Sequence, residues 1–527
     1  MARLSRATPS CEEEEDKHTA KEKLMDGWKL TDPLAWAQEM FGAAELGDPR
    51  RTRRLVRVAA QMAADPQGSL PREMGGNWAA LKAAYRLVRA DGVTHEAISR
   101  PVWQQTRQQV EQEPGVVLVV HDDTEVDDGY RPAISGFGPI GNGTQRGFFV
   151  HTVLAVVPRG SRERVLGLLH QEAWVRQSAP RQDDGSKQSS RERRERPRES
   201  EVWTRAVEQV GSPPAGEVWI HVADRYADMF AFLQRCRQMG TFFLVRAAQN
   251  RRVLSEEEQV EPELDHLLDR AKSWSAQAHG SIDVPSEHER RARTAQVQLS
   301  WGCMHLLPPE EGPDAGSDSL QIWVVRVWEP EPPGKEEAQR EWVRSQKHGS
   351  HRRREPQSEE VEALEWILLS ALPVESVEQA WQAVHHYSSR WPIEDFHRGV
   401  KTGCRLEQRH LQEQGSLENL LAIVSPIAVR LLQLRNLCRE EPEQPAMVWV
   451  EPEEAQVIAS QQGVAVERLT IEQFVFSVAQ LGGFLRRASD GPPGWQTLWE
   501  GWRRLRWFVA GMRFAADARF DTYARSP

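Results

Sequence analysis

Short, uninterrupted apolar runs between residues 116 and 246 constrain the fold of this chain more than any other feature of its sequence. Val116–Val120 and Val218–Ala223 are two of them, and polar stretches separate them from three further runs at 148–157, 164–170 and 242–245. Runs of this length that do not alternate with polar residues are typical of strands buried on both faces of a sheet. The sequence therefore predicts an α/β fold in which helices cover a central sheet.

The pattern on either side of these runs divides the chain further. With 527 residues it is too long for one ordinary core. Residues 1–33 are polar and without period, which predicts a disordered tail. Residues 34–107 and 411–527 have helical patterns, and residues 108–410 carry the apolar runs. Two stretches interrupt residues 108–410: a hydrophilic loop at 178–201 and a β-rich insertion at about 255–360. The insertion ends in the basic loop Lys347–Arg354.

The composition excludes several classes of protein. Hydrophobic residues make up 39% of the chain and charged residues 27%, which is typical of a soluble globular protein. There is no run of about 18 apolar residues to span a membrane. The N-terminus lacks the apolar core of a signal peptide, so we expect a cytoplasmic protein. The cysteines are too scattered for a disulfide framework or a zinc site: Cys11, Cys236, Cys303, Cys404 and Cys438.

Two N-terminal segments concentrate positive charge, although the formal net charge of the chain is −10. Because salt screens each charge beyond about 10 Å, local concentration matters more than the net charge. Basic helices suit the phosphate backbone of a nucleic acid. A solvated helix face explains the composition alone equally well. The residues are Arg50, Arg51, Arg53, Arg54 and Arg57 in the first segment, and Lys82, Arg86 and Arg89 in the second.

Three acidic residues stand where a ligand site is expected. Asp122 and Asp224 follow two of the apolar runs, and strand ends project side chains into the crevice where α/β proteins bind ligands. Glu394 follows Pro392, a good first-turn residue, on a helix whose spacing places it on one face with Lys401 and a histidine. Carboxylates that converge from separate elements can hold a pair of divalent cations for phosphodiester chemistry. Each aspartate taken alone is more often a turn or helix cap.

The segment from residue 387 to residue 401 is more specific. It reads YSSRWPIEDFHRGVK and has the form Y-x2-R-x3-E-x6-K. This resembles the hallmark of the Tn-five-like branch of the insertion-sequence-four family of DDE transposases. Further segments are similar to the same family: LGDPRRTRRL at 46–55, ADRYAD at 223–228, WILLS at 366–370, and LGGF at 481–484. The apolar stripe at residues 495–509 resembles the dimerisation helices of the family.

The resemblance implies an RNase H-like catalytic core with a β-rich insertion, flanked by a helical N-terminal DNA-binding domain and a C-terminal dimerisation domain. It also implies cut-and-paste transposition of an insertion sequence through a DNA hairpin. A homodimer would bring two transposon ends together and join them to target DNA. Asp122, Asp224 and Glu394 would form the catalytic triad and hold Mg²⁺, with Mn²⁺ as a possible substitute.

The same resemblance assigns DNA contacts. Tyr387, Arg390 and Lys401 would hold phosphates near the cleaved end. Trp366 lies 28 residues before Glu394, at the place of the tryptophan that stacks on a flipped base. The remaining assignments are to Arg246, beside the hairpin, and to Arg50, Arg51 and Arg54 of the end-binding helix.

The chain departs from the family at its first acidic site. The family usually has Asp-Thr-Thr there, whereas this chain has Asp122-Asp123-Thr124, preceded by His121. Asp122 keeps the offset to the strand and to Thr124, but Asp123 stays open as the first ligand. The alternative functions are a transposase-derived DNA-binding regulator or inhibitor that lacks strand transfer, a nuclease that hydrolyses DNA without joining it and, more distantly, a phosphatase. Short inverted repeats beside the gene would favour the transposase.

Overall fold

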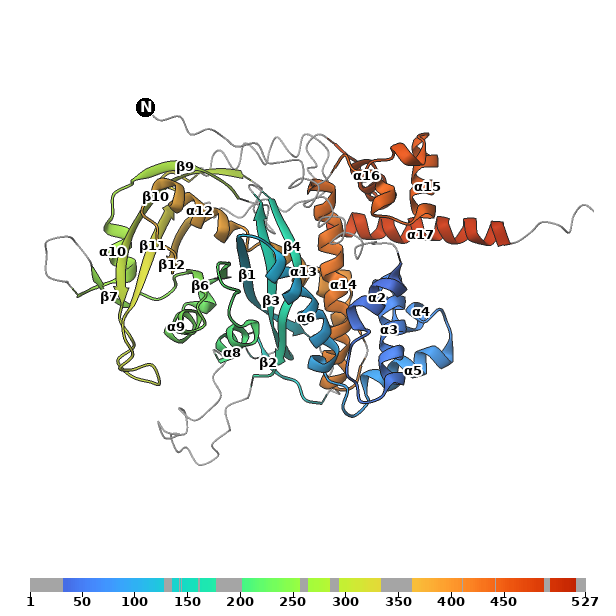
Figure 1. Ribbon diagram of the computed structural model, residues 1–527, viewed down its shortest axis with the longest axis horizontal. Coiled ribbons are helices and arrows are strands. Elements are labelled where there is room, and N and C mark those ends of the chain that lie inside the picture. Colours follow the sequence, from blue (N-terminus) through green and yellow to red (C-terminus); the bar gives the residue numbers. More distant parts are fainter. Residues whose placement is uncertain are drawn as a thin grey trace, which may run out of the picture.

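The computed structural model describes residues 32–127, 135–176, 201–255, 264–284, 293–332 and 363–517, apart from residues 142, 144, 160, 161, 410, 441 and 488–492. Almost all of the predicted N-terminal tail, the hydrophilic loop at 178–201 and the basic loop at 347–354 lie outside the described residues. The chain has a mixed α/β architecture, as the apolar runs predict, and one large sheet extends from the middle of the molecule to one side of it (Figure 1).

The predicted apolar runs form five adjacent strands in the order β4-β3-β1-β5-β6. β1 pairs in parallel with β5, and β5 with β6, whereas β3 is antiparallel to β1 and to β4. A short strand, β2 (Gly138–Ile140), adds to the far side of β3. The bounds are β1 Val116–Asp127, β3 Gln145–Arg159, β4 Arg162–Trp174, β5 Val218–Ala223 and β6 Phe242–Arg246.

The β-rich region continues the same sheet and does not form a separate one. β12 pairs antiparallel with β6, and the sheet then runs through β11, β10, β7 and β8. β9 also pairs with β10, beside β7 on the edge opposite β11. The bounds are β7 Arg252–Ser255, β8 Leu264–His266, β9 Ala278–Val284, β10 Arg293–Leu306, β11 Leu320–Trp328 and β12 Glu365–Ser370, and the short helix α10 covers Leu267–Ser273.

Side chains of β1 alternate between two separate cores. Val117 and Val119 pack in a cluster with residues of α8 (Glu201–Val210). Leu118 and Val120 pack in the larger cluster, which includes the long helix α14 (Gln414–Glu440). Because successive strand residues point to opposite faces, helices on both faces bury residues 117–120 of β1 completely. α9 (Phe230–Gln238) lies beside α8, while α6 (His95–Gln112) and α14 pack against β4.

The helices from the two ends of the chain lie together on one side of the sheet, at the right in Figure 1. At the N-terminal side these are α2 (Pro33–Phe41), α3 (Pro49–Ala64), α4 (Leu70–Glu73) and α5 (Trp78–Val88). Asp48 caps α3 by accepting a hydrogen bond from the Arg50 amide, and Pro49 starts its first turn. At the C-terminal side these are α15 (Pro452–Gln462), α16 (Ile471–Leu481) and α17 (Trp495–Asp517), which build a cluster of their own.

One window of α14, Gln414–Gln433, has the length and hydropathy of a membrane span. Within the protein 89% of it is buried, as in the core helix of a packed domain. Its environment is therefore protein on almost every side. Two further helices, α12 (Val377–Ser388) and α13 (Pro392–Arg398), carry the motif that begins at residue 387.

The prediction that the first strand ends just before Asp122 is wrong. β1 continues to Asp127 because β3 pairs with it throughout, including Asp122 opposite Thr152. What ends near Asp122 is the parallel ladder with β5, whose last pair is Val120 with Val222. Asp122 therefore has no parallel partner because β5 is shorter than β1.

Candidate active site

The register between β1 and β5 brings two of the predicted acids together. Val120 is paired with Val222, so Asp122 and Asp224 each lie two residues beyond the same pair. Asp224 follows the last residue of β5 and caps the short helix η1 (Arg225–Ala227), where its Oδ1 accepts a 2.9 Å hydrogen bond from the Tyr226 amide. Asp224 therefore has the capping role that is common for an aspartate at such a position. Only its Oδ1 atom takes part in this cap.

Glu394 approaches the same place from α13 (Pro392–Arg398), which packs on the face of β1 that carries Asp122. It lies in the first turn of α13, which begins at Pro392 as expected. The guanidinium of Arg390 contacts Glu394 through Nη2 and lies 3.4 Å from Asp122 Oδ2 through Nη1. Arg390 and Asp122 are largely buried, with 14% and 16% of their side chains exposed. One cation therefore links two carboxylates that are 272 positions apart in the sequence (394 minus 122).

This arrangement makes the Asp122 carboxylate unfavourable as an anion. Burial above all, opposed by Arg390 and assisted by Asp224, Glu394 and Asp123, raises the pKa of Asp122 to about 7. A carboxylate surrounded in this way favours a partner with more positive charge than one arginine supplies. The excess negative charge is the electrostatic property expected of a divalent-cation site.

The donor set fits Mg²⁺, but the side chains are not assembled around an ion. Among the residues that the structure describes, no three His, Cys, Asp or Glu side chains are close enough to form a finished metal site. The guanidinium of Arg390 contacts two of the three carboxylates and occupies the place between them that a metal ion would take. Mg²⁺ prefers carboxylate oxygens and keeps several waters, so Asp122, Asp224 and Glu394 suffice in number and type. Binding requires the guanidinium to move.

His397 and Lys401 are placed differently from the prediction of one helical face. The α-helix ends at Arg398, and a π-helical turn, η2 (Gly399–Gly403), carries Lys401. The Nδ1 atom of His397 lies 3.7 Å from Asp122 Oδ2. Burial above all, together with the nearby charges of Lys401 and Arg390, lowers the pKa of His397 to about 3. Lys401 Nζ lies 3.9 Å from Glu407, at the edge of the site.

Tyr387 connects the remaining predicted residues. Its ring meets that of Trp366 edge to face, with centroids 5.2 Å apart. Burial raises the pKa of Tyr387, while Arg390 and Arg246 lower it, so both cations lie near the phenol. Arg246 also donates a 2.9 Å hydrogen bond to the Glu365 carbonyl on β12. Trp366, Tyr387, Arg246 and Arg390 thus form one continuous group beside the carboxylates.

Asp123 points to the opposite face of β1. Its Oδ1 lies 2.7 Å from His151 Nδ1 on β3, and its Oδ2 accepts a 3.1 Å hydrogen bond from the indole of Trp203 on α8. Neighbouring strand residues face opposite ways, so Asp122 and Asp123 cannot both face α13. The structure separates the two candidates that the sequence left open.

Three buried histidines extend this second group, and the sequence analysis missed their association. His121 on β1 lies 3.2 Å from His151 and 2.7 Å from His221 on β5, measured between ring nitrogens. Burial lowers the pKa of His121 well below its usual range and that of His221 to about 3. The detectable signal was the period of two that relates His121 to Asp123 on one strand. Without the strand order, nothing placed His151 and His221 beside them.

The basic N-terminal surface is divided between two roles. The guanidinium of Arg51 donates to the carbonyls of Leu46 and Asp91, which holds the helices together. The side chains of Arg50 and Arg54 make no hydrogen bond or ion pair within the described part of the chain. On α5, an open hollow is lined by Lys82, Tyr85, Arg86, Arg89 and Gln412. Positive charge is therefore available at the surface of both helices.

The C-terminal helix α17 has two apolar faces. Leu505 and Val509 of the predicted stripe are buried against α16, so this part of the stripe packs internally. A second face, which the sequence analysis did not identify, exposes 70% of Trp507 and 75% of Phe514, together with Phe508 and Met512. Large exposed aromatic side chains of this kind are favoured at protein interfaces.

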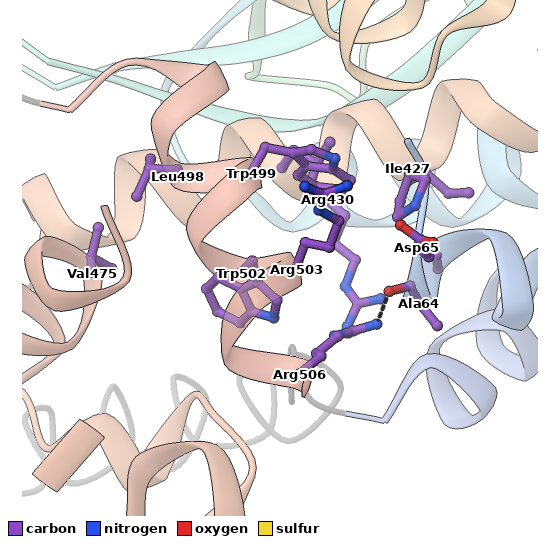
Figure 2. Close-up of a pocket in the computed structure, with 13 residues that line it drawn as sticks. Ala64, Asp65, Ile427, Arg430, Val475, Leu498, Trp499, Trp502, Arg503 and Arg506 are labelled. Atoms are coloured by element: carbon purple, nitrogen blue, oxygen red, sulfur yellow. Dashed lines mark hydrogen bonds between the residues drawn. The ribbon is translucent and has the colours of Figure 1, made fainter. Parts of the chain in front are cut away.

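Figure 2 shows a separate cavity between the N-terminal and C-terminal helices, lined by Trp499 and Trp502 of α17 and by Arg430 of α14. Arg506 of α17 donates a hydrogen bond to the Ala64 carbonyl at the end of α3. Asp122, Asp224 and Glu394 are not among the residues that line this cavity. The cavity marks a direct contact between the two helical ends of the protein.

Two stretches of the chain match known protein families. Residues 33–93 match the family described as Transposase DNA-binding, and residues 426–521 match the one described as Transposase Tn5 dimerisation domain. The first stretch contains α3 and α5, and the second contains α15–α17. Together they indicate a transposase that binds DNA and dimerises. More particularly, the matches support a Tn5-like transposase family.

Proposed function

We propose that the protein is a metal-dependent transposase of the insertion-sequence-four family that moves its element by cutting both ends and pasting them into target DNA. The observation that carries this proposal is the convergence of Asp122, Asp224 and Glu394 around the guanidinium of Arg390. These acids come from three separate elements, and both Arg390 and Glu394 belong to the motif Y-x2-R-x3-E-x6-K. They lie between stretches that match transposase DNA-binding and dimerisation domains.

We further propose that the five strands around Asp122 form an RNase H-like core. Their order, β4-β3-β1-β5-β6, supports this, as does the combination of three parallel strands with an antiparallel β3. Within such a core, the carboxyl ends of parallel strands hold ligands in the crevice outside the sheet. Asp122 and Asp224 lie at that edge, and α13 brings Glu394 to it.

Asp122, Asp224 and Glu394 are proposed to hold Mg²⁺, with Mn²⁺ as a substitute. When bound, these ions supply activation of the attacking oxygen and stabilisation of the leaving oxygen of a phosphodiester. Arg390 exchanges its two carboxylate contacts for a DNA phosphate, which its planar donors can hold in a bidentate fashion. Tyr387 and Lys401 position the neighbouring phosphates. Trp366, beside Tyr387, offers an aromatic face to an unstacked base, and Arg246 is placed to hold the bent strand.

The decisive experiment is incubation of the purified chain with a duplex carrying the end of its element, Mg²⁺ and a target plasmid. Denaturing gels are expected to resolve a nicked strand, then a hairpin, then a product joined to the target. Hydrolysis without joining would instead indicate a nuclease. End binding without any cleavage would indicate a DNA-binding regulator, in which three converging carboxylates have no use.

The N-terminal surface gives a second test of the proposal. Replacing Arg50 and Arg54 with alanine is expected to weaken binding to the transposon end and to reduce the slope of log affinity against log salt by about one unit for each phosphate that is no longer neutralised. Binding isotherms at four salt concentrations measure both quantities. Arg100→Ala is a matched control, because it removes an exposed cation that is paired with Glu96 on α6. Equal slopes for all variants would contradict the assignment.

A further inference from the structure

On the face of β1 opposite Asp122 and Glu394, a buried series of hydrogen-bonded side chains joins β1 to β5. It runs from Trp203 and Asp123 through His151 and His121 to His221. The three histidine side chains are fully buried, between the sheet and the helices α8 and α9. Buried polar groups of this kind stabilise one arrangement strongly when each N–H donor has an acceptor.

These side chains link β1 to β5 where the pairing of their backbones ends. The last pair of the parallel ladder is Val120–Val222, and His221 is paired with Val119 just before it. His121 is the first residue of β1 after the ladder, and its 2.7 Å contact with His221 joins the two strands at that end. Asp122 follows His121 directly, and Asp224 follows His221 by three residues. A change in the length or direction of this contact therefore alters the separation of the two carboxylates.

The charge of Asp123 sets the direction in which these side chains donate their hydrogen bonds. An ionised carboxylate only accepts hydrogen bonds, so His151 donates from Nδ1 and Trp203 from its indole. A neutral His151 then accepts at Nε2 from His121 Nδ1, and His121 accepts at Nε2 from His221 Nδ1. The series ends at His221 Nε2, which is buried without a partner in the described part of the structure. This is the better polarity, because a buried N–H without an acceptor is rarer than an unused acceptor.

We propose that Asp123 is a positioning residue and not a metal ligand: through His151, His121 and His221 it sets the spacing of Asp122 and Asp224. This inference rests on the proposed function of those two carboxylates as metal ligands. It assigns opposite tasks to two adjacent aspartates, one on each face of β1. The three histidines are all assigned the Nδ1–H tautomer.

Asp123→Asn tests the proposal because it preserves shape but adds a donor. If the amide oxygen faces His151, the new NH₂ group opposes the indole N–H of Trp203. If the amide turns over, its NH₂ reverses all three tautomers and leaves an N–H on His221 Nε2 without an acceptor. We expect affinity for Mn²⁺ to fall about tenfold, as when other groups that orient metal ligands are replaced. Electron paramagnetic resonance measures the affinity from the concentration of free Mn²⁺, with the full-length protein and without DNA.

A second substitution distinguishes positioning from ligation. Trp203→Phe removes the donor that conflicts with the new amide, so Asp123→Asn/Trp203→Phe is expected to recover Mn²⁺ affinity to within about threefold of the parent. Trp219→Phe is the matched control. It shortens another buried tryptophan that packs between the sheet and α8 and whose indole N–H has no acceptor in the described chain. It should not restore the affinity. A loss in Asp123→Asn that Trp203→Phe fails to reverse would overturn the proposal, because a metal ligand cannot be restored in this way.

Two further measurements keep the test complete. In ¹⁵N-histidine NMR spectra the parent and the double variant should show Nδ1–H tautomers for the three histidines, and Nε2–H tautomers in the parent would overturn the assigned direction. Should Asp123→Asn not fold, His221→Phe removes the β5 end of the series without touching Asp123. An unchanged Mn²⁺ affinity in that variant contradicts the proposal. A parent that binds Mn²⁺ but cleaves no DNA contradicts only the proposed function, whereas a parent that binds no Mn²⁺ contradicts both.

Discussion

Alanine at Asp122, Asp224 or Glu394 is expected to lower the rate of transposon-end nicking by at least about 1000-fold, which corresponds to about 4 kcal/mol of transition-state stabilisation. Three carboxylates share the positive charge of the proposed ions, so the loss of one removes ligand oxygens that the others cannot replace. End binding should change little, because it depends on the basic surfaces of α3 and α5. Nicking of a labelled duplex in Mg²⁺ or Mn²⁺, with a gel-shift measurement on the same samples, tests both expectations.

Asp395→Asn is the matched control for these variants. Asp395 is adjacent to Glu394 on α13, but its carboxylate is paired with Arg435 at 2.6 Å. Its loss should lower thermal stability without abolishing nicking. Metal binding also has a readout in stability: Mn²⁺ should raise the melting temperature of the parent and not that of Asp122→Ala. Full nicking activity in Asp122→Ala would remove that residue from the site.

Trp366→Ala is expected to spare first-strand nicking but to slow hairpin formation by about tenfold to a hundredfold, since stacking of a base on an aromatic side chain contributes about 1–3 kcal/mol. A hairpin requires the second strand to bend sharply into the same site, and an unstacked base eases that bend. Trp366 is only partly buried on β12 and lies edge to face with Tyr387, beside Arg390. A time course that separates nicked, hairpin and double-end-break products measures the effect.

Trp366→Phe distinguishes stacking from packing. Phenylalanine retains an aromatic face, so it should restore most of the hairpin rate while filling less of the space against Tyr387. Thermal unfolding of both variants reports the packing loss separately. If Trp366→Ala slows both strand-cleavage steps equally and also melts at a lower temperature, Trp366 serves the core and the stacking role is wrong.

The apolar runs were sufficient to predict the α/β sheet and where its buried strands lie. Their lack of alternation reflects burial on both faces, which local sequence records directly. They did not predict that β1 runs on to Asp127, because that extension depends on pairing with β3, and the polar residues 121–125 carry no apolar signal. The family motif named the candidate acids and cations, while the π-helical turn that carries Lys401 left no periodic trace.

By itself, the sequence determined the types of residue available for chemistry: two aspartates and a glutamate near buried strands, with arginine, lysine and aromatic side chains close by. The sequence alone could not decide between Asp122 and Asp123 as the first ligand. The two-residue period of a strand shows that adjacent residues face opposite ways, but it does not show which face packs against which helix. Only the packing of α13 on one face of β1, and of α8 on the other, placed Asp122 beside Glu394 and Asp123 beside a chain of buried histidines. Contacts between residues 28 positions apart (Asp123 and His151) to 268 positions apart (Asp122 and Arg390) decided that difference, and no local pattern encodes them.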